Sequence, residues 1–259
     1  MISVLCAIKN RSEHLLQSYK SWLLCEGVDE VVIVDWGSDT PICQELEQHE
    51  KLKIVQVNPN HTKYWAFGQA YNLAARFATS DYLLLMNADE IIIDKKEICE
   101  LSIPDSDFFY EGISWEDSRA HGVYFLYISK DNFWSVNGYN ELLVGYGYDD
   151  VDLKRRLKKS GLTKKTASVK IEHIKHRATH SSWENYLNTE ISQHTSWDLS
   201  KKLTGIKFKN EDNIIYCDVD EEYRITDELI ANRKKRGKVL SKRVKDFKEN
   251  PGKYEMGHG

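Results

Sequence analysis

Residues 82–90 read YLLLMNADE, an apolar run that ends in an amide and two acids. The run Tyr82–Met86 is short and continuously apolar, which is typical of a strand buried on both faces. It follows Ala66–Ala78, where apolar side chains recur at helical spacing. Asp89 comes just after the end of the strand. The stretch therefore predicts a helix and then a buried strand that brings an acid to one edge of a sheet.

The chain before this stretch repeats the same pattern. Further buried-strand runs occur at Ile2–Ile8, Val31–Val34 and Ile54–Val57, and helical spacing follows the first of them. We also expect a helix over Pro41–Gln48. Strands that alternate with helices of this length predict a doubly wound α/β sheet, which binds ligands at the carboxyl ends of its parallel strands. Three charged residues fall at such ends: Arg11, Asp35 and Asp89.

The pattern changes in the second half of the chain. We expect strands at Phe108–Ile113 and Val123–Ser129 with no helix between them. The sequence GYGYDDVD then predicts a helix that begins near Asp149 and stops at Gly161. One more short strand is expected near residue 170. From about residue 183 the pattern is helical and polar.

The composition is that of an ordinary globular protein. The 259 residues are 41% hydrophobic and 29% charged, with a formal net charge of -4, which excludes a disordered, collagen-like or disulfide-rich chain. The five cysteines include no C-x-x-C pair, so we expect a reducing, cytoplasmic location. No stretch has the pattern of a signal peptide or of a membrane-spanning helix.

Two motifs carry a resemblance to a known family. The sequence KNRSEHL at residues 9–15 resembles the N-R-x-E-H-L opening of beta-1,4-galactosyltransferase-type enzymes, and residues 138–156 resemble their N-G-F/Y, G-W-G-x-E-D-D-D and R-L signature. In addition, DWGS at 35–38 and ADE at 88–90 are similar to the D-D-G-S and D-A-D-D elements of family 2 glycosyltransferases. The resemblance implies a GT-A fold, which is a Rossmann-like mixed sheet flanked by helices.

The resemblance also implies a division of the chain. It covers residues 1–180, which we expect to be the catalytic domain, with the nucleotide sugar bound by 1–100 and the acceptor by 101–180. Residues 181–259 lie outside it and are expected to form a helical extension with a basic end. That end is open to three interpretations: a solvated helix face, a surface that docks on anionic lipid, or a nucleic-acid patch. We expect no nucleic-acid partner, because the chain is slightly acidic and has no binding motif.

A divalent cation, Mn²⁺ or Mg²⁺, is implied by the same resemblance. Asp89 matches the last Asp of the family's D-x-D element, which binds metal through hard oxygen atoms. Asn87 occupies the position of the first Asp of this element. We expect it to contact the UDP-sugar donor, although it carries no charge. Further along, His176 matches the family's additional metal ligand and His173 its companion position. Two alternatives are a separate zinc site that includes His180, and plain surface histidines.

Three acids open the helix expected at residue 149. Acidic side chains are stabilised by the free N–H groups of a helix N-terminus, so capping alone explains one or two of them. By resemblance, Asp150 is the general base that deprotonates the acceptor hydroxyl, and Asp149 holds an acceptor hydroxyl. Attack from the face opposite the leaving nucleotide inverts the anomeric configuration. Val151 replaces an acid common in the family, which leaves the identity of the acceptor open.

Aromatic and charged side chains near the motifs are candidate sugar and nucleotide contacts. We expect Trp134 and Tyr148 at the acceptor and Tyr146 at the donor, with core packing as the alternative for each. Arg11 can pair with the diphosphate through its planar guanidinium group. The resemblance to family 2 implies that Asp35 binds the uracil or the ribose.

Together these features predict a metal-dependent inverting glycosyltransferase of surface polysaccharide synthesis. It moves a hexose or N-acetylhexosamine, galactose-type favoured, from a UDP-sugar to a saccharide or lipid-linked saccharide. The basic extension is available for peripheral contact with the inner face of an anionic membrane. One alternative is a sugar-nucleotide pyrophosphorylase, although its Gly-rich loop after the first strand is missing. The other is a saccharide- or nucleotide-sugar-binding protein on a decayed transferase scaffold.

Overall fold

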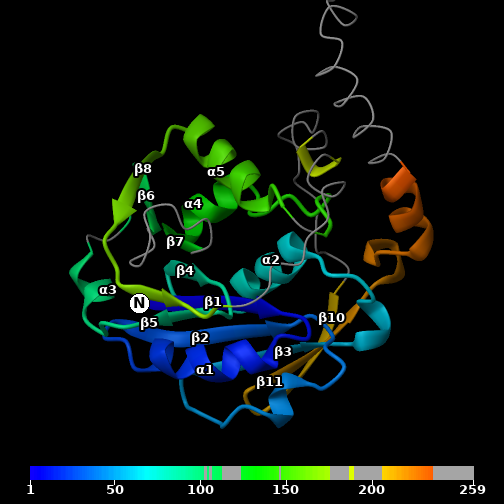
Figure 1. The fold of residues 1–259 in the computed structure, drawn as a ribbon, viewed down its shortest axis with the longest axis horizontal. Coiled ribbons are helices and arrows are strands. Elements are labelled where there is room, and N and C mark those ends of the chain that lie inside the picture. The colour runs from blue at the N-terminus through cyan, green and yellow to red at the C-terminus, as the bar shows by residue number, and fades with distance from the viewer. Residues whose placement is uncertain are drawn as a thin grey trace, which may run out of the picture.

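The computed structural model describes residues 1–101, 104, 107–112, 124–145, 147–175, 187–189 and 206–235. Within these ranges the chain forms a nine-stranded mixed sheet in the order β10-β11-β3-β2-β1-β4-β7-β6-β8, flanked by helices (Figure 1). A small sheet pairs β5 with β9. This architecture confirms the expected mixed α/β fold. The strands of the main sheet are β1 (Ile2–Ile8), β2 (Val28–Asp35), β3 (Leu52–Val57), β4 (Tyr82–Met86), β6 (Phe108–Gly112), β7 (Phe125–Ser129), β8 (Thr163–Ala167), β10 (Ile206–Glu211) and β11 (Ile214–Val219).

The centre of the sheet is parallel; α1 (Ser12–Leu23) connects β1 to β2 and α2 (Phe67–Phe77) connects β3 to β4, whereas only a short turn lies between β2 and β3. Strand β1 lies between β2 and β4 and runs parallel to both. Strand β7 is antiparallel to β4 and to β6, so the sheet becomes mixed beyond this point. The described part of the chain also contains the strands β5 (Glu90–Ile92) and β9 (Ile171–His173), the α-helices α3 (Glu97–Glu100), α4 (Lys130–Ser135) and α5 (Asp149–Lys159), and the 3-10 turns η1 (Ile42–Gln44), η2 (Pro59–His61) and η3 (Glu221–Tyr223). Residues 187–189 and 227–235 are helical as well.

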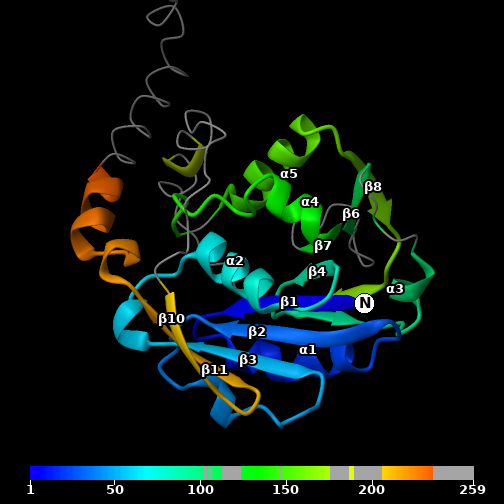
Figure 2. The ribbon, with the colours of Figure 1, turned by 180° about the vertical axis from the view of Figure 1, so that it is seen from behind.

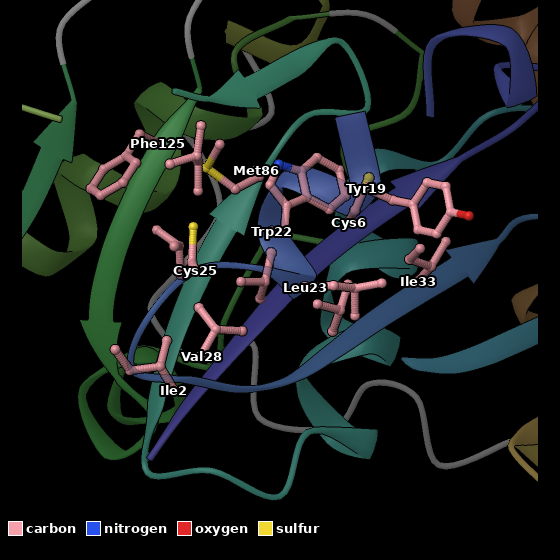
Figure 3. Packing of buried hydrophobic residues seen from close by; sticks show 14 of the residues in the cluster. Ile2, Cys6, Tyr19, Trp22, Leu23, Cys25, Val28, Ile33, Met86 and Phe125 are labelled. Atoms are coloured by element: carbon pink, nitrogen blue, oxygen red, sulfur yellow. The ribbon is translucent and has the colours of Figure 1, made fainter. Parts of the chain in front are cut away.

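Two hydrophobic cores lie on the two faces of the sheet. Helix α1 covers one face; it lies in front of β2 and β3 in Figure 1 and behind them in Figure 2. Its Trp22 is fully buried near Cys6 and Met86 (Figure 3). Helices α2, α4 and α5 cover the other face, where Leu153 and Leu157 of α5 join the core. Both helix layers therefore pack on the strands whose ends carry the predicted site.

The structure contains elements that the sequence pattern did not predict, among them β5, β8 and α4. It also contradicts the expectation in two regions. The helix expected over Pro41–Gln48 is reduced to the short turn η1, because only Ile42 and Leu46 of this segment are buried and the backbone N–H of Ile42 bonds to Asp35. The extension expected to be helical contains a β-hairpin. Of its described residues, 187–189 and 227–235 are helical, whereas 206–219 form strands.

The hairpin extends the main sheet. Ile215, Cys217 and Val219 alternate with exposed or partly exposed residues along β11 and are buried, which is the period-2 pattern of a strand. The turn between β10 and β11 places Asp212 at a positive φ of 54°. Strand β11 pairs in parallel with β3, and Figure 2 shows the hairpin beside it. The sheet is thus completed by residues from outside the expected catalytic domain.

No helix within the described ranges is both long and apolar enough to span a bilayer. The basic segment continues past residue 235, where it lies outside the described residues.

Candidate active site

The turn between β4 and β5 places Asp89 at the carboxyl end of the central strands. Behind it, Glu90 is completely buried, and its carboxylate accepts hydrogen bonds from the backbone N–H groups of Asn87, at 2.7 Å, and Tyr124. Burial raises the pKa of Glu90 well above its ordinary value, because apolar surroundings disfavour the charged form. Glu90 therefore fixes this turn from the inside, a role that no sequence motif singled out.

Helix α1 and strand β9 hold the backbone of the same turn. Ser18 Oγ donates to the carbonyl oxygen of Ala88 at 2.6 Å, and Trp22 Nε1 donates to that of Glu90 at 2.9 Å. Directly after β9, the N–H of Ile174 donates to the carbonyl oxygen of Asp89 at 2.8 Å. Buried backbone groups need such partners. With the backbone satisfied in this way, the position of the Asp89 carboxylate is well defined.

The Asp89 carboxylate meets two of the other predicted site residues. His173 Nε2 lies 3.7 Å from Asp89 Oδ2, and Arg11 Nη1 lies 3.9 Å from the same oxygen. Two donor atoms that bind one cation at about 2.1 Å each can be at most about 4.2 Å apart. The separation of Asp89 and His173 therefore fits a single Mn²⁺ or Mg²⁺ ion between them. Arg11 lies close enough to contact an anion bound to that ion.

The other expected metal contacts do not complete a site made of protein atoms alone. His176 and His180 lie outside the described residues, and the residues that are described contain no group of three or more His, Cys, Asp or Glu that could hold a metal. The Asn87 amide is turned toward the fold: its Nδ2 donates to Glu90 at 3.4 Å, and its Oδ1 accepts from the Tyr71 hydroxyl at 3.5 Å. A site with few protein donors suits a cation that also binds substrate phosphates.

The loop before α5 has an unusual backbone that presents the acidic cluster. Gly147 has φ 97° and Tyr148 has φ 76°, a region that glycine enters freely and tyrosine rarely. Asn188 is completely buried, and its Nδ2 donates to the carbonyl oxygen of Gly147 at 2.7 Å. Tyr148 is partly exposed beside Asp149, and Tyr146 lies outside the described residues. A residue from beyond the predicted catalytic domain thus holds this loop, and no pattern in the sequence indicated it.

The three acids at the start of α5 lie in different surroundings. Asp152 is buried, and its Oδ2 accepts from Arg156 Nε at 2.8 Å, so it fixes the helix. Asp149 is also buried, and burial raises its pKa well above the ordinary value. Asp150 has a 40% exposed side chain, whose Oδ2 lies 2.8 Å from Lys154 Nζ. Of the three acids, Asp150 has the most exposed side chain.

Tyr124 connects the acidic cluster with the Asp89 turn. Its backbone N–H donates to Glu90, and its hydroxyl hydrogen-bonds to that of Tyr139. Its pKa is raised by burial and then by the negative charges of Asp150 and Glu90. The Tyr124 side chain therefore lies within electrostatic reach of both acidic regions. No motif included this residue.

Asp35 stabilises its own loop. It is completely buried, and its carboxylate accepts hydrogen bonds from the N–H groups of Ser38, at 2.8 Å, and Ile42, at 2.9 Å. Gln56 Nε2 donates to it at 2.9 Å. Both carboxylate oxygens are thus used inside the protein. This geometry does not fit the expected contact with uracil or ribose, because the side chain has no exposed surface.

Trp134 lies away from the other predicted site residues. Helix α4 follows the end of β7 at which Ser129 pairs with Tyr82, and Asp89 follows the opposite end of β4. The guanidinium carbon of Arg76, on α2, lies 5.9 Å from the centre of the Trp134 ring. The structure therefore supports the packing alternative for Trp134 and not the expected acceptor contact.

Comparison with protein families gives two matches, in chain order. Residues 3–101 match the model of glycosyl transferase family 2, and residues 117–180 match that of the N-terminal domain of galactosyltransferase. The first match contains the Asp89 turn, and the second contains the acidic cluster of α5. Comparison with curated protein sequences gives no match.

Solved structures of glycosyltransferases share the fold at low sequence identity. The catalytic domain of Drosophila beta1,4galactosyltransferase 7, in complex with xylobiose, is 16% identical with a TM-score of 0.57, over 85% of this chain and 94% of that one. S. aureus TarS 1-349 with UDP-GlcNAc is 13% identical with a TM-score of 0.56, over 74% and 65%. The mannosyltransferase PcManGT from Pyrobaculum calidifontis, with GDP-Man and Mn²⁺, is 14% identical with a TM-score of 0.57, over 74% and 61%. The two family matches, on a fold shared with these proteins, identify the chain as a glycosyltransferase of the GT-A type.

Proposed function

We propose that the chain is a metal-dependent, inverting glycosyltransferase that moves a hexose or N-acetylhexosamine from a UDP-sugar to a saccharide hydroxyl. The observation that carries this proposal is the cluster at the turn after β4, where His173 Nε2 and Arg11 Nη1 lie 3.7 Å and 3.9 Å from Asp89 Oδ2. The hydrogen bond from the Tyr124 backbone N–H to Glu90 fixes the same turn, and Asp150, with a 40% exposed side chain, is the proposed proton acceptor. Galactose is the favoured sugar, because the second family match is to a galactosyltransferase domain.

On the donor side, Asp89 and His173 hold the cation and Arg11 contacts the diphosphate. The distances of 3.7 Å and 3.9 Å to Asp89 Oδ2 support this assignment. A bound cation neutralises the negative charge that develops on the departing diphosphate. The Arg11 guanidinium adds a second positive charge with directed donors. His176, the other ligand implied by resemblance, remains a prediction. A mutant of Drosophila beta1,4galactosyltransferase 7 has been crystallised with manganese, UDP-Gal and xylobiose, which agrees with this choice of ion and donor.

On the acceptor side, Asp150 takes the proton of the attacking hydroxyl. The hydroxyl oxygen forms a bond to the anomeric carbon, the carbon–oxygen bond to the diphosphate breaks, and UDP leaves with that electron pair. Attack from the side opposite UDP inverts the anomeric configuration. A positioned carboxylate of this kind contributes about 10² to 10⁴ in rate. Asp149 and Tyr148 stand beside Asp150 and are proposed to contact the acceptor.

The cellular setting is also a proposal. We assign the chain to surface polysaccharide synthesis in the cytoplasm, with a lipid-linked saccharide as the acceptor. All five cysteines are free thiols, which agrees with a reducing compartment. Residues 1–180 would form the catalytic domain together with the hairpin that completes its sheet.

The test is UDP release from a panel of UDP-sugars with Mn²⁺ and saccharide acceptors, xylobiose included. We expect release that depends on both Mn²⁺ and the acceptor for at least one donor. Asp150→Asn is the matched control, because it keeps the size of the side chain and removes its basicity. Tight donor binding with no release from any pair would instead support the saccharide- or nucleotide-sugar-binding alternative.

A further inference from the structure

The acidic cluster contains a lysine that the proposed chemistry does not yet use. Lys154 lies one turn after Asp150 on α5, and its Nζ is 2.8 Å from Asp150 Oδ2. The same nitrogen lies 2.6 Å from Glu111 Oε1, on β6. Lys154 is therefore bonded to two carboxylates at once, one on the helix and one on the sheet.

The sheet fixes the lysine more firmly than the helix alone would. Glu111 Oε2 lies 3.2 Å from Lys164 Nζ on β8, so the Glu111 carboxylate is itself held by two cations. The Lys154 side chain is only 19% exposed, compared with 40% for Asp150. A lone exposed ion pair along a helix contributes little order. A half-buried lysine held from a neighbouring strand has fewer conformations available and can orient its partner.

Asp150 contacts a positively charged side chain and has several acidic groups nearby. Lys154 is the cation in direct contact with it, while Asp149 on the same helix, Glu111 on β6 and Tyr124 before β7 are acidic groups nearby. Burial lowers the pKa of Lys154, but the attraction of Asp150 and Glu111 outweighs burial, so this pKa is raised overall. Burial raises the pKa of Glu111, but its hydrogen bonds to Lys154 and Lys164 outweigh burial, so this pKa is lowered overall. Lys154 is therefore protonated and cannot itself be the base.

We infer that Lys154, held by Glu111, is a positioning residue for the proposed base Asp150. It occupies Oδ2 of Asp150 and so directs the other oxygen, Oδ1, toward the acceptor hydroxyl. Its positive charge also lies between the Asp150 and Glu111 carboxylates, 2.8 Å from one and 2.6 Å from the other. This inference rests on the proposed function of Asp150.

The principal experiment compares pH profiles of kcat/KM for four variants of the full chain, with the UDP-sugar and saccharide pair that gives turnover. Lys154→Met removes the charge at nearly constant length. Lys154→Arg restores it, and Glu111→Gln removes the charge that holds it. Lys158→Met is the control, because Lys158 lies one further turn along α5, is exposed, and has been given no role.

For Lys154→Met we expect kcat to fall by roughly tenfold to a hundredfold with little change in the KM of the donor. The acidic limb of its profile should move to higher pH, because an adjacent cation favours the ionised form of a carboxylate. Lys154→Arg should recover most of the kcat, and Lys158→Met should have the kcat of the natural protein. The kcat of Glu111→Gln should lie between those of Lys154→Met and the natural protein. A Lys154→Met enzyme with an unmoved acidic limb and normal kcat overturns the inference.

A second measurement needs no turnover. The carbon-13 resonance of the Asp150 carboxyl, assigned with Asp150→Asn, should titrate at a higher pH in Lys154→Met than in the natural protein. An unchanged titration overturns the inference even if no substrate pair is found. Failure of the proposed function looks different: Asp150→Asn would keep normal turnover, whatever Lys154→Met does. A fall in melting temperature alone, without either pH effect, would show that Lys154 has only a structural role.

Discussion

His173 and Glu90 lie opposite each other in the antiparallel pair of β5 and β9. Because Asp89 directly precedes Glu90, this pairing brings the end of β9 to the carboxylate that follows β4, and His173 Nε2 comes within 3.7 Å of Asp89 Oδ2. Two three-residue strands thus align the proposed metal ligands.

Asp89→Ala should weaken Mn²⁺-dependent binding of UDP by at least about tenfold, and His173→Ala should weaken it less, because the carboxylate supplies the charge. Isothermal titration of UDP with and without Mn²⁺ measures both effects. Glu172→Ala is the control, since Glu172 is exposed and precedes His173 on β9. Equal UDP affinity in Asp89→Ala and the natural protein, with Mn²⁺ present, would reject the metal assignment.

Asp150→Asn should lower kcat by roughly a hundredfold or more, because the amide cannot accept the hydroxyl proton. The affinity for the UDP-sugar should stay nearly the same, since Asp150 is assigned to the acceptor. Steady-state UDP release gives kcat, and titration of the donor gives the affinity. Near-normal turnover would remove Asp150 from the role of base.

Asp35→Ala should destabilise the fold rather than alter nucleotide recognition. It leaves three N–H donors, from Ser38, Ile42 and Gln56, without their acceptor. A buried donor without a partner costs about 1–3 kcal/mol, so the free energy of unfolding in urea should fall by at least about 2 kcal/mol. The exposed neighbour Asp39 provides the control variant Asp39→Ala. Normal stability combined with lost uridine binding would return Asp35 to the donor site.

Glu90 should make the stability of the protein depend on pH. Burial raises the pKa of Glu90 in the folded state. At a pH above the ordinary pKa of about 4.5, Glu90 is therefore deprotonated in the unfolded chain while it is still protonated in the folded chain. The stability contributed by protonated Glu90 is therefore lost progressively as the pH rises from there toward the folded pKa. Glu90→Gln cannot ionise, so its stability relative to the natural protein should rise with pH. Urea unfolding at several values between about pH 5 and pH 8 tests this, and parallel pH curves would contradict it.

The central strands and the ligand-bearing ends could be predicted because the signals are local. The apolar runs of β1 to β4 and the acids that follow them are contiguous in sequence, and the resemblance to glycosyltransferase motifs indicated Asp89 and Asp150, whose roles stay predictions. Contacts between distant segments carry no such signal. The link from Asn188 to Gly147 and the hydrogen bond from Tyr124 to Glu90 depend on tertiary packing alone.

Errors in the sequence-based prediction have physical causes of the same kind. Asp35 stands at a strand end, as a ligand would, but the loop after β2 turns its own N–H groups onto the carboxylate. Trp134 is near the motif in sequence, yet β7 runs antiparallel to β4 and carries it to the other end of the sheet. The hairpin of β10 and β11 was missed because one of its strands is almost wholly exposed and rich in charge.

The pairing of β11 with β3 sets a practical limit on how this enzyme can be shortened or recombined. A polypeptide cut at residue 180 would retain both family matches, yet β3 would become an exposed edge strand. Its unpaired backbone N–H and C=O groups would promote self-association. The shortened polypeptide would also lose Asn188, whose side-chain amide bonds to Gly147 in the loop before Asp150. Chimeras that exchange acceptor specificity should therefore place their junctions beyond the hairpin.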